Sequence, residues 1–78
     1  MNKENQVKQT EIENNFKYHA PTPKQVGIYG QLRNNGKDLV EYINAVCPDS
    51  REKSIAITKI EEAIMWANAS IARDDQWL

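Results

Sequence analysis

The sequence has little of what most small secreted, membrane or nucleic-acid-binding proteins depend on. It has one cysteine, Cys47, among 78 residues, which excludes an intrachain disulfide and fits a reducing cytoplasm. No apolar run approaches the roughly 18 residues of a membrane span. The polar start, Met1–Gln6, lacks the apolar stretch of a signal peptide. The net charge of −1 argues against capture of long nucleic acid by bulk electrostatics.

Residue patterns that carry enzyme chemistry are also missing. The single histidine, His19, has no obvious cysteine or carboxylate partner in the sequence, and Cys47 beside Pro48 is typical of a turn or core residue. Glu61 and Glu62 are adjacent, and adjacent helical residues point apart. There is no glycine-rich phosphate loop and no metal-ligand spacing. The sequence therefore predicts a protein that is not an enzyme and has no cofactor.

Residues 1–15 form a polar segment with few apolar positions. Val7, Glu11, Ile12 and Phe16 mark one side of a short helix, which would be unstable alone. Two interpretations remain open: a frayed terminus, or a short helix that becomes ordered against a partner.

A first long helix is predicted over residues 23–46. Thr22 suits the cap, Pro23 the first helical position, and Gln25 the third position of a capping box. The apolar residues that follow fall into one stripe at helical spacing: Ile28, Leu32, Leu39, Ile43 and Val46.

A second long helix is predicted over about residues 50–73, after a turn at 47–50. Pro48 ends the first helix, and Asp49 with Glu52 forms the predicted cap of the second. Its apolar stripe repeats at spacings of three and four: Ile57, Ile60, Ile64, Ala67 and Ile71.

These features predict an all-α fold, in which residues 16–78 form an antiparallel helical hairpin preceded by a short N-terminal helix.

Ile55 and Trp66 lie on the opposite side of the second helix from Ile64. We interpret them as a second buried face in a homo-oligomer larger than a dimer, because a 78-residue hairpin builds a marginal core. The alternative is that they are scattered surface residues.

Candidate ligand-binding residues cluster near the start of the first long helix. Arg33 and Lys37 follow Tyr29 at intervals of four, beside the apolar stripe, and three glycines lie in the same helix. Tyr18 and His19 add flat rings on the proline-stiffened segment before it. Rings stack on bases and cations pair with phosphates, so this pattern is one that a small-nucleotide site would need. The alternative is that Arg33 and Lys37 are ordinary solvated residues on the flank of a helix. The glycines indicate either a weak helix or close approach of a backbone or ligand.

The strongest resemblance lies in three stretches. They are Phe16-Lys17-Tyr18-His19-Ala20-Pro21, Pro48-Asp49-Ser50-Arg51-Glu52-Lys53-Ser54, and the helix from Thr58 through Met65-Trp66-Ala67-Asn68 to Arg73. Over residues 14–73 the chain resembles the hairpin domain of phage anti-defence proteins that sequester cyclic oligonucleotide signals. One branch of that family is an anti-CBASS sponge. Another is an anti-Thoeris sponge with an added β-rich domain for a cyclic ADP-ribose isomer, for which this chain has no room.

The resemblance implies an all-helical homohexamer in the host bacterial cytoplasm that binds without cleaving. Its implied ligands are cyclic dinucleotides of the cyclic GMP-AMP type and cyclic trinucleotides of the cyclic tri-adenylate type, held at different subunit interfaces. CBASS effectors would then stay inactive.

By the same resemblance, Tyr18 stacks on a base in one site, with Arg33 or Lys37 as its phosphate partner, and Arg73 serves the other site. Asn34-Asn35-Gly36 departs from the family's usual alanine- and lysine-rich pattern, so the resemblance does not choose between Arg33 and Lys37. Two other functions stay open: an oligomeric helical adaptor that binds a protein partner, and an enzyme subunit acting on cyclic nucleotides.

Overall fold

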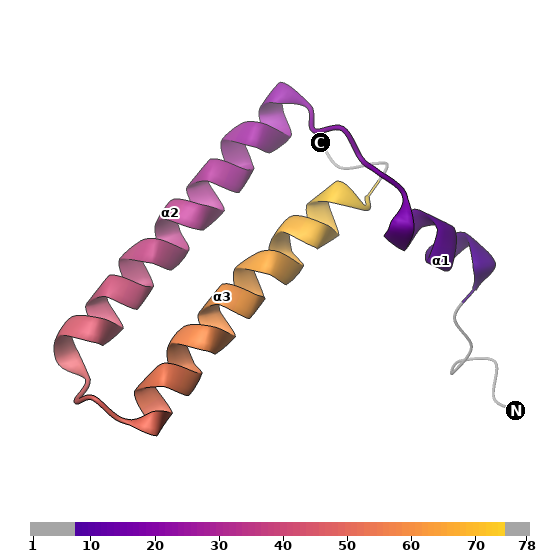
Figure 1. Ribbon diagram of the computed structural model, residues 1–78. Helices are drawn as coiled ribbons and strands as arrows, with labels where there is room; N and C mark the ends of the chain where they lie inside the picture. The colour runs from indigo at the N-terminus through magenta and orange to yellow at the C-terminus, as the bar shows by residue number, and fades with distance from the viewer. Residues whose placement is uncertain (1–7, 75–78) are drawn as a thin grey trace, which may run out of the picture.

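The computed structural model describes residues 8–74 and consists of three helices, which confirms the all-α class (Figure 1). Helix α1 spans Gln9–Phe16, α2 spans Pro23–Val46 and α3 spans Arg51–Ala72. Residues 8–74 contain no strand, and none of their helices has the length and apolarity needed to cross a membrane. The short N-terminal helix is therefore formed. Val7, which was predicted to lie on its apolar side, is outside the described residues.

The start of α2 follows the predicted capping box. The Thr22 Oγ1 atom accepts a hydrogen bond from the Gln25 backbone N–H at 3.2 Å, and the Gln25 Oε1 atom accepts one from the Thr22 N–H at 2.9 Å. Pro23 occupies the first turn, where its missing N–H costs nothing. The bounds of this helix match the sequence prediction.

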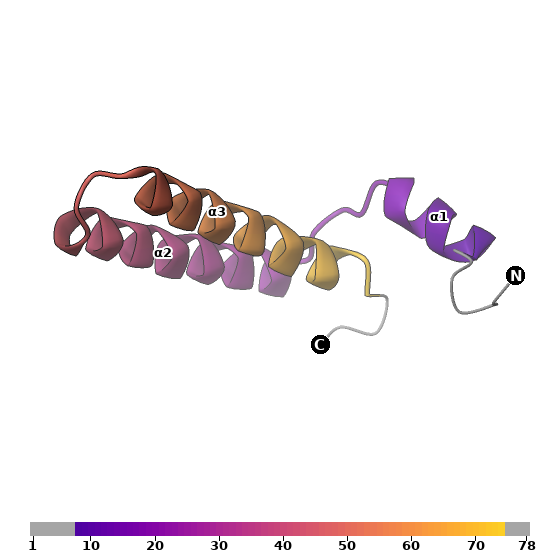
Figure 2. The same ribbon diagram turned by 90° about the horizontal axis from the view of Figure 1, so that it is seen from below.

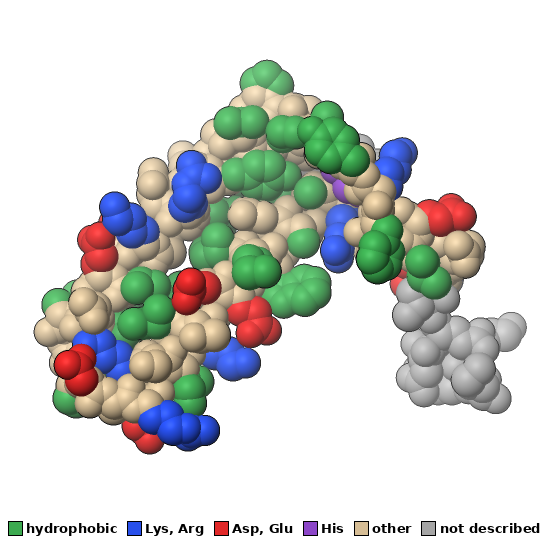
Figure 3. All heavy atoms as spheres, viewed as in Figure 1, with side chains coloured by type: hydrophobic (Ala, Val, Ile, Leu, Met, Phe, Trp, Pro, Cys, Tyr) green, Lys and Arg blue, Asp and Glu red, His purple; other side chains and the backbone are tan. Residues whose placement is uncertain are grey.

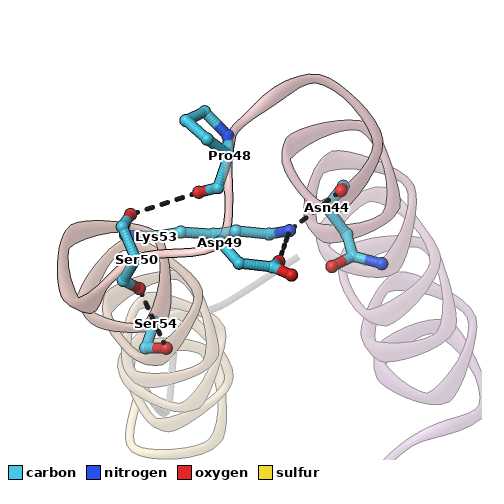
Figure 4. Close-up of polar contacts among 6 residues, drawn as sticks. All are labelled: Asn44, Pro48, Asp49, Ser50, Lys53 and Ser54. Atoms are coloured by element: carbon cyan, nitrogen blue, oxygen red, sulfur yellow. Dashed lines mark hydrogen bonds and ion pairs between the residues drawn. The ribbon is translucent and has the colours of Figure 1, made fainter.

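The predicted cap of α3 is wrong. Ser50, not Asp49, is the N-cap, and its hydroxyl oxygen accepts from the Lys53 N–H at 3.1 Å, so Glu52 is not placed for a capping box. The Asp49 carboxylate instead binds the Lys53 ammonium at 2.8 Å (Figure 4). An adjacent cation attracts a carboxylate more strongly than the backbone amides of the first turn do, which leaves the hydroxyl of Ser50 to cap.

Lys53 ties this turn together. Its Nζ atom also donates to the Asn44 carbonyl oxygen at 3.0 Å, so one ammonium links the last turn of α2 to the first turn of α3 (Figure 4). Its side chain is only 9% exposed, whereas that of Asp49 is fully exposed. The hydrogen bond and the charge of Lys53 lower the pKa of the Asp49 carboxyl.

Helices α2 and α3 run antiparallel and side by side, as predicted (Figures 1 and 2). The predicted stripe of α3 faces α2, with Ile71 buried and the other four positions half-buried. The stripe of α2 is wrong in part: Leu39 and Val46 are exposed, and Gly36 is the buried residue of this helix. A Cβ atom on Gly36 would lie 2.8 Å from Ile64 Cγ1. Close approach at this glycine turns the contact side of α2 away from Leu39 and Val46.

The hairpin is a single layer of two helices, which leaves its core thin (Figure 2). Ile71, at 8% exposed, is the only buried hydrophobic residue in the part of the chain that the structure describes. Ile55 and Trp66 lie on the outside of the hairpin and are exposed, in agreement with their predicted direction. Their burial in a homo-oligomer stays a prediction.

Candidate ligand-binding surface

The start of α2 and the end of α3 meet at one end of the hairpin, opposite the turn, and this region is called the open end below. The Gln25 Nε2 atom donates to the Ile71 carbonyl oxygen at 3.4 Å across the two helices. The Asn14 Nδ2 atom, from α1, donates to the Arg73 carbonyl oxygen at 2.9 Å. The last carbonyls of α3 thus receive side-chain donors, which is what helix ends require.

The segment between α1 and α2 carries the two predicted rings, and the structure gives them different surroundings. His19 is half-buried, and its Nε2–H donates to the Asn14 carbonyl oxygen at 2.8 Å. Tyr18 is 83% exposed. The histidine therefore fixes the segment against α1, and the tyrosine next to it is largely open to solvent.

Arg73 lies at the same end, over an aromatic ring. Its guanidinium carbon is 6.0 Å from the centroid of the Trp66 ring, within the range of a cation–π contact. Arg73 is also the C-cap of α3, where positive charge is favoured by the helix dipole. Sequence reasoning assigned Trp66 to an oligomer face and missed this pairing. The signal in the sequence was that Trp66 and Arg73 are seven residues apart, a spacing that places two side chains on the same side of a helix.

Arg33 and Lys37 lie elsewhere, on the rim of a groove between α2 and α3, here called the hairpin groove. Its volume is about 460 Å³, and its lining is mainly apolar: Arg33, Gly36, Lys37, Val40, Ile57, Ile60, Glu61, Ile64 and Met65. Figure 3 shows hydrophobic side chains gathered between the two helices, with Lys and Arg side chains over α2. Lys37 Nζ is 3.8 Å from Glu41 Oε1, and both side chains are exposed.

One chain therefore brings some predicted site residues together and keeps others apart. His19 and the backbone of Arg73 are linked at the open end through Asn14, and Tyr18 is the exposed neighbour of His19 in the sequence. Sequence reasoning missed Asn14 because its bond to Arg73 spans 59 positions. Arg33 follows the start of α2 by ten residues, which is about 15 Å along the helix. The two cationic places that the sequence indicated are separate within a chain.

A known family accounts for this architecture. The family model described as the Acb2/Tad1 hairpin domain matches residues 8–72, which includes α1 as well as the hairpin. The chain belongs to the Acb2/Tad1 hairpin family. No curated protein and no solved structure matches it.

Membership in the Acb2/Tad1 hairpin family implies a sponge-like role against host defence, with binding of cyclic nucleotide second messengers. Family members sequester their ligands and are not enzymes; they are phage proteins that act in the infected cell. Among residues 8–74 no cluster of side chains is arranged to hold a metal ion.

Proposed function

We propose that this protein binds cyclic dinucleotides and cyclic trinucleotides without cleaving them, and so keeps CBASS effectors inactive in the host cytoplasm. The observation that carries the proposal is the family match over residues 8–72. In this proposal the active species is a homohexamer, and both ligands bind between subunits.

The open end supplies a stacking ring for one ligand class and an arginine for the other. An exposed ring such as Tyr18 gives a stacking surface for any base, and such stacking contributes about 1–3 kcal/mol per base. Arg73 provides a planar fork of donors that suits a phosphodiester, and the Trp66 ring beneath it restricts its orientation. In our proposal Tyr18 serves the dinucleotide, and Arg73 serves the trinucleotide.

The hairpin groove supplies the remaining cations. Lys37 is already paired with Glu41 across one helical turn, and both side chains are solvated, so this pair is weak and easily exchanged for a phosphate. Arg33 and Lys37 are the candidate phosphate partners of the dinucleotide site, which then requires residues of a second subunit to meet Tyr18.

The deciding experiment follows the fate of the ligand. Purified protein is incubated with a cyclic dinucleotide, the free ligand is measured, and the protein is then denatured by heat and the released nucleotide is chromatographed. A sponge depletes the ligand and returns it intact. An enzyme returns product, and an adaptor for a protein partner depletes nothing. Either of the last two results contradicts the proposal.

A competition experiment tests the two separate sites. Protein saturated with a cyclic dinucleotide is titrated with a cyclic trinucleotide, in wild type, Arg73→Ala and Arg51→Ala. Arg51 is an exposed arginine at the other end of the same helix and serves as the matched control. We expect both ligands to bind together, with only Arg73→Ala weakening the trinucleotide. Displacement of one ligand by the other would contradict two sites.

A further inference from the structure

The rim of the hairpin groove carries charges of both signs on opposite helices. Arg33 and Lys37 lie on the α2 side, and Glu61 lies on the α3 side. Lys37 is paired with Glu41, whereas within residues 8–74 the Glu61 carboxylate has no hydrogen bond or ion pair. An ionised carboxyl is only an acceptor, so both oxygens of Glu61 are open to N–H donors from an occupant of the groove.

Glu61 lies almost level with Lys37 along the hairpin. Gly36 lies opposite Ile64, because a Cβ atom on Gly36 would be 2.8 Å from Ile64 Cγ1. Counting three residues from this contact along each antiparallel helix, Glu61 is level with Leu39, which is two residues or roughly 3 Å from Lys37. The axes of packed helices are about 8–10 Å apart, so one small ligand in the groove meets both rims.

The floor between the two rims is apolar. Gly36 has no side chain, and Val40 and the isoleucines of α3 form the rest of the floor. Met65, one turn after Glu61 on the same rim, is 69% exposed and offers a thioether that packs well on an aromatic ring. An occupant that fits is an aromatic ring with N–H donors toward α3 and negative charge toward α2. A nucleotide has this arrangement, since its base carries the N–H groups and its phosphate the charge.

Among the common bases, guanine alone presents two adjacent N–H donors on one edge. Its N1–H and N2–H groups are parallel and match the two oxygens of a carboxylate, so both hydrogen bonds are charge-assisted. Adenine and cytosine place a ring-nitrogen lone pair beside the amino group, and uracil flanks its N–H group with two carbonyl oxygens. Each of these three bases sets an acceptor against the Glu61 carboxylate, which disfavours its binding.

We propose that Glu61 recognises guanine, so that this protein prefers guanine-containing cyclic dinucleotides to those that contain only other bases. The guanine lies on the floor of the groove with its N1–H and N2–H groups on Glu61, and the adjoining phosphate lies against Lys37 or Arg33. The second base is left for Tyr18 of another subunit. This inference rests on the proposed function and deepens it, because it adds a base preference to the dinucleotide site.

Titration calorimetry with three ligands tests the base preference. Cyclic GMP-AMP has one guanine, cyclic di-AMP has none, and the analogue cyclic IMP-AMP keeps the N1–H group but lacks the N2 amine. We expect wild type to bind cyclic GMP-AMP about tenfold or more tightly than either of the others. A factor of this size is expected when a hydrogen bond to a charged group is lost.

Glu61→Gln gives a readout that a purely structural role would not move. The amide loses the charge and sets an N–H group against a donor of guanine, so cyclic GMP-AMP should bind about tenfold or more weakly. Cyclic di-AMP should bind at least as tightly as to wild type, because the repulsion is removed. Glu62→Gln is the matched control, since Glu62 pairs with Lys59 at 3.5 Å and lies outside the groove lining. It should leave all three affinities unchanged.

The possible results separate the guanine preference from the proposed function. Equal affinities of wild type for cyclic GMP-AMP and cyclic di-AMP would overturn the guanine preference and leave the sponge function standing. A preference that persists in Glu61→Gln, an equal loss of both ligands in that variant, or the same effect from Glu62→Gln would also overturn the role of Glu61. If wild type binds none of the three ligands, the proposed function fails as well.

Discussion

The two ends of the hairpin are held by different kinds of contact. At the turn, Lys53 binds Asp49 and the Asn44 carbonyl, so its partners are four and nine positions away in the sequence. At the open end, Asn14 and Gln25 bind carbonyls that are 59 and 46 positions away. The turn has mainly local contacts, whereas the open end has long-range contacts that link α1 and the start of α2 to the last turn of α3, where Arg73 lies. The contrast suggests that stability and ligand binding depend on separate residues.

The largest effect is expected between the two ends, at Gly36. Gly36→Val should lower the free energy of unfolding by about 1–3 kcal/mol, because the new side chain overpacks against Ile64, which a Cβ would meet at 2.8 Å. Adding Ile64→Ala should recover part of the loss. Gly27 is the matched control, since a Cβ there meets nothing within 4 Å, so Gly27→Ala should stabilise by ~0.5–1 kcal/mol. Urea unfolding measures all four proteins.

At the open end, Tyr18→Ala should weaken cyclic dinucleotide binding by about 1–3 kcal/mol through loss of one base stack. Stability should not change, because the side chain is almost wholly exposed. Titration calorimetry and thermal unfolding on the same samples separate the two effects. Tyr42, an exposed tyrosine on α2, is the control, and equal losses for Tyr42→Ala would remove Tyr18 from the site.

At the turn, Lys53→Met should have the opposite profile. It keeps most of the apolar stem but removes the bonds to the Asn44 carbonyl and to Asp49, so it should lower stability by ~1–2 kcal/mol. Ligand affinity should stay at the wild-type value. Lys59→Met, which loses only an exposed pair with Glu62, should be nearly neutral. A loss of ligand affinity in Lys53→Met would mean that the two ends are coupled.

Asn14→Ala tests whether α1 is held at the open end. The variant removes the donor to the Arg73 carbonyl and should cost about 1 kcal/mol of local stability. Hydrogen exchange should increase in α1 and at the last turn of α3, with no change at the turn. Asn15→Ala, an exposed neighbour, is the control. If hydrogen exchange increased equally along the whole chain, the Asn14 side chain would not act locally at the open end.

The smallest effect is expected at Asp49. Its pKa is lowered by Lys53, so the ionised carboxyl stabilises the fold above the pKa of the unfolded chain, and this contribution is lost as pH falls through the lowered folded value. Asp49→Asn should therefore be slightly less stable than wild type at neutral pH and equal to it in strong acid. Urea midpoints at the two pH values measure this. If the stability difference between wild type and Asp49→Asn instead grew as the pH fell, the ionised Asp49 carboxyl would not be the stabilising form.

The two long helices and most of their bounds follow from local sequence patterns, whereas the sequence left α1 open between a short helix and a frayed terminus. Thr22, Pro23 and Gln25 determine the start of α2 through contacts no more than three residues apart, and the stripe from Ile57 to Ile71 identifies the side of α3 that faces α2. Such features are readable because their physics is local and periodic. The prediction of Asp49 and not Ser50 as the cap was wrong because the Asp49 carboxylate binds the Lys53 ammonium and not the backbone amides of the first turn.

The contacts across the hairpin follow from how the chain packs and not from local sequence patterns. The approach at Gly36 turned Leu39 and Val46 outward, which a period of 3.6 residues could not reveal, because it depends on how closely the other helix packs. The bond from Asn14 to the Arg73 carbonyl joins residues 59 positions apart and has no sequence signal. Tyr18 and Arg73 were found as residue types, but their shared end and the separate place of Arg33 and Lys37 follow from where the chain folds back on itself.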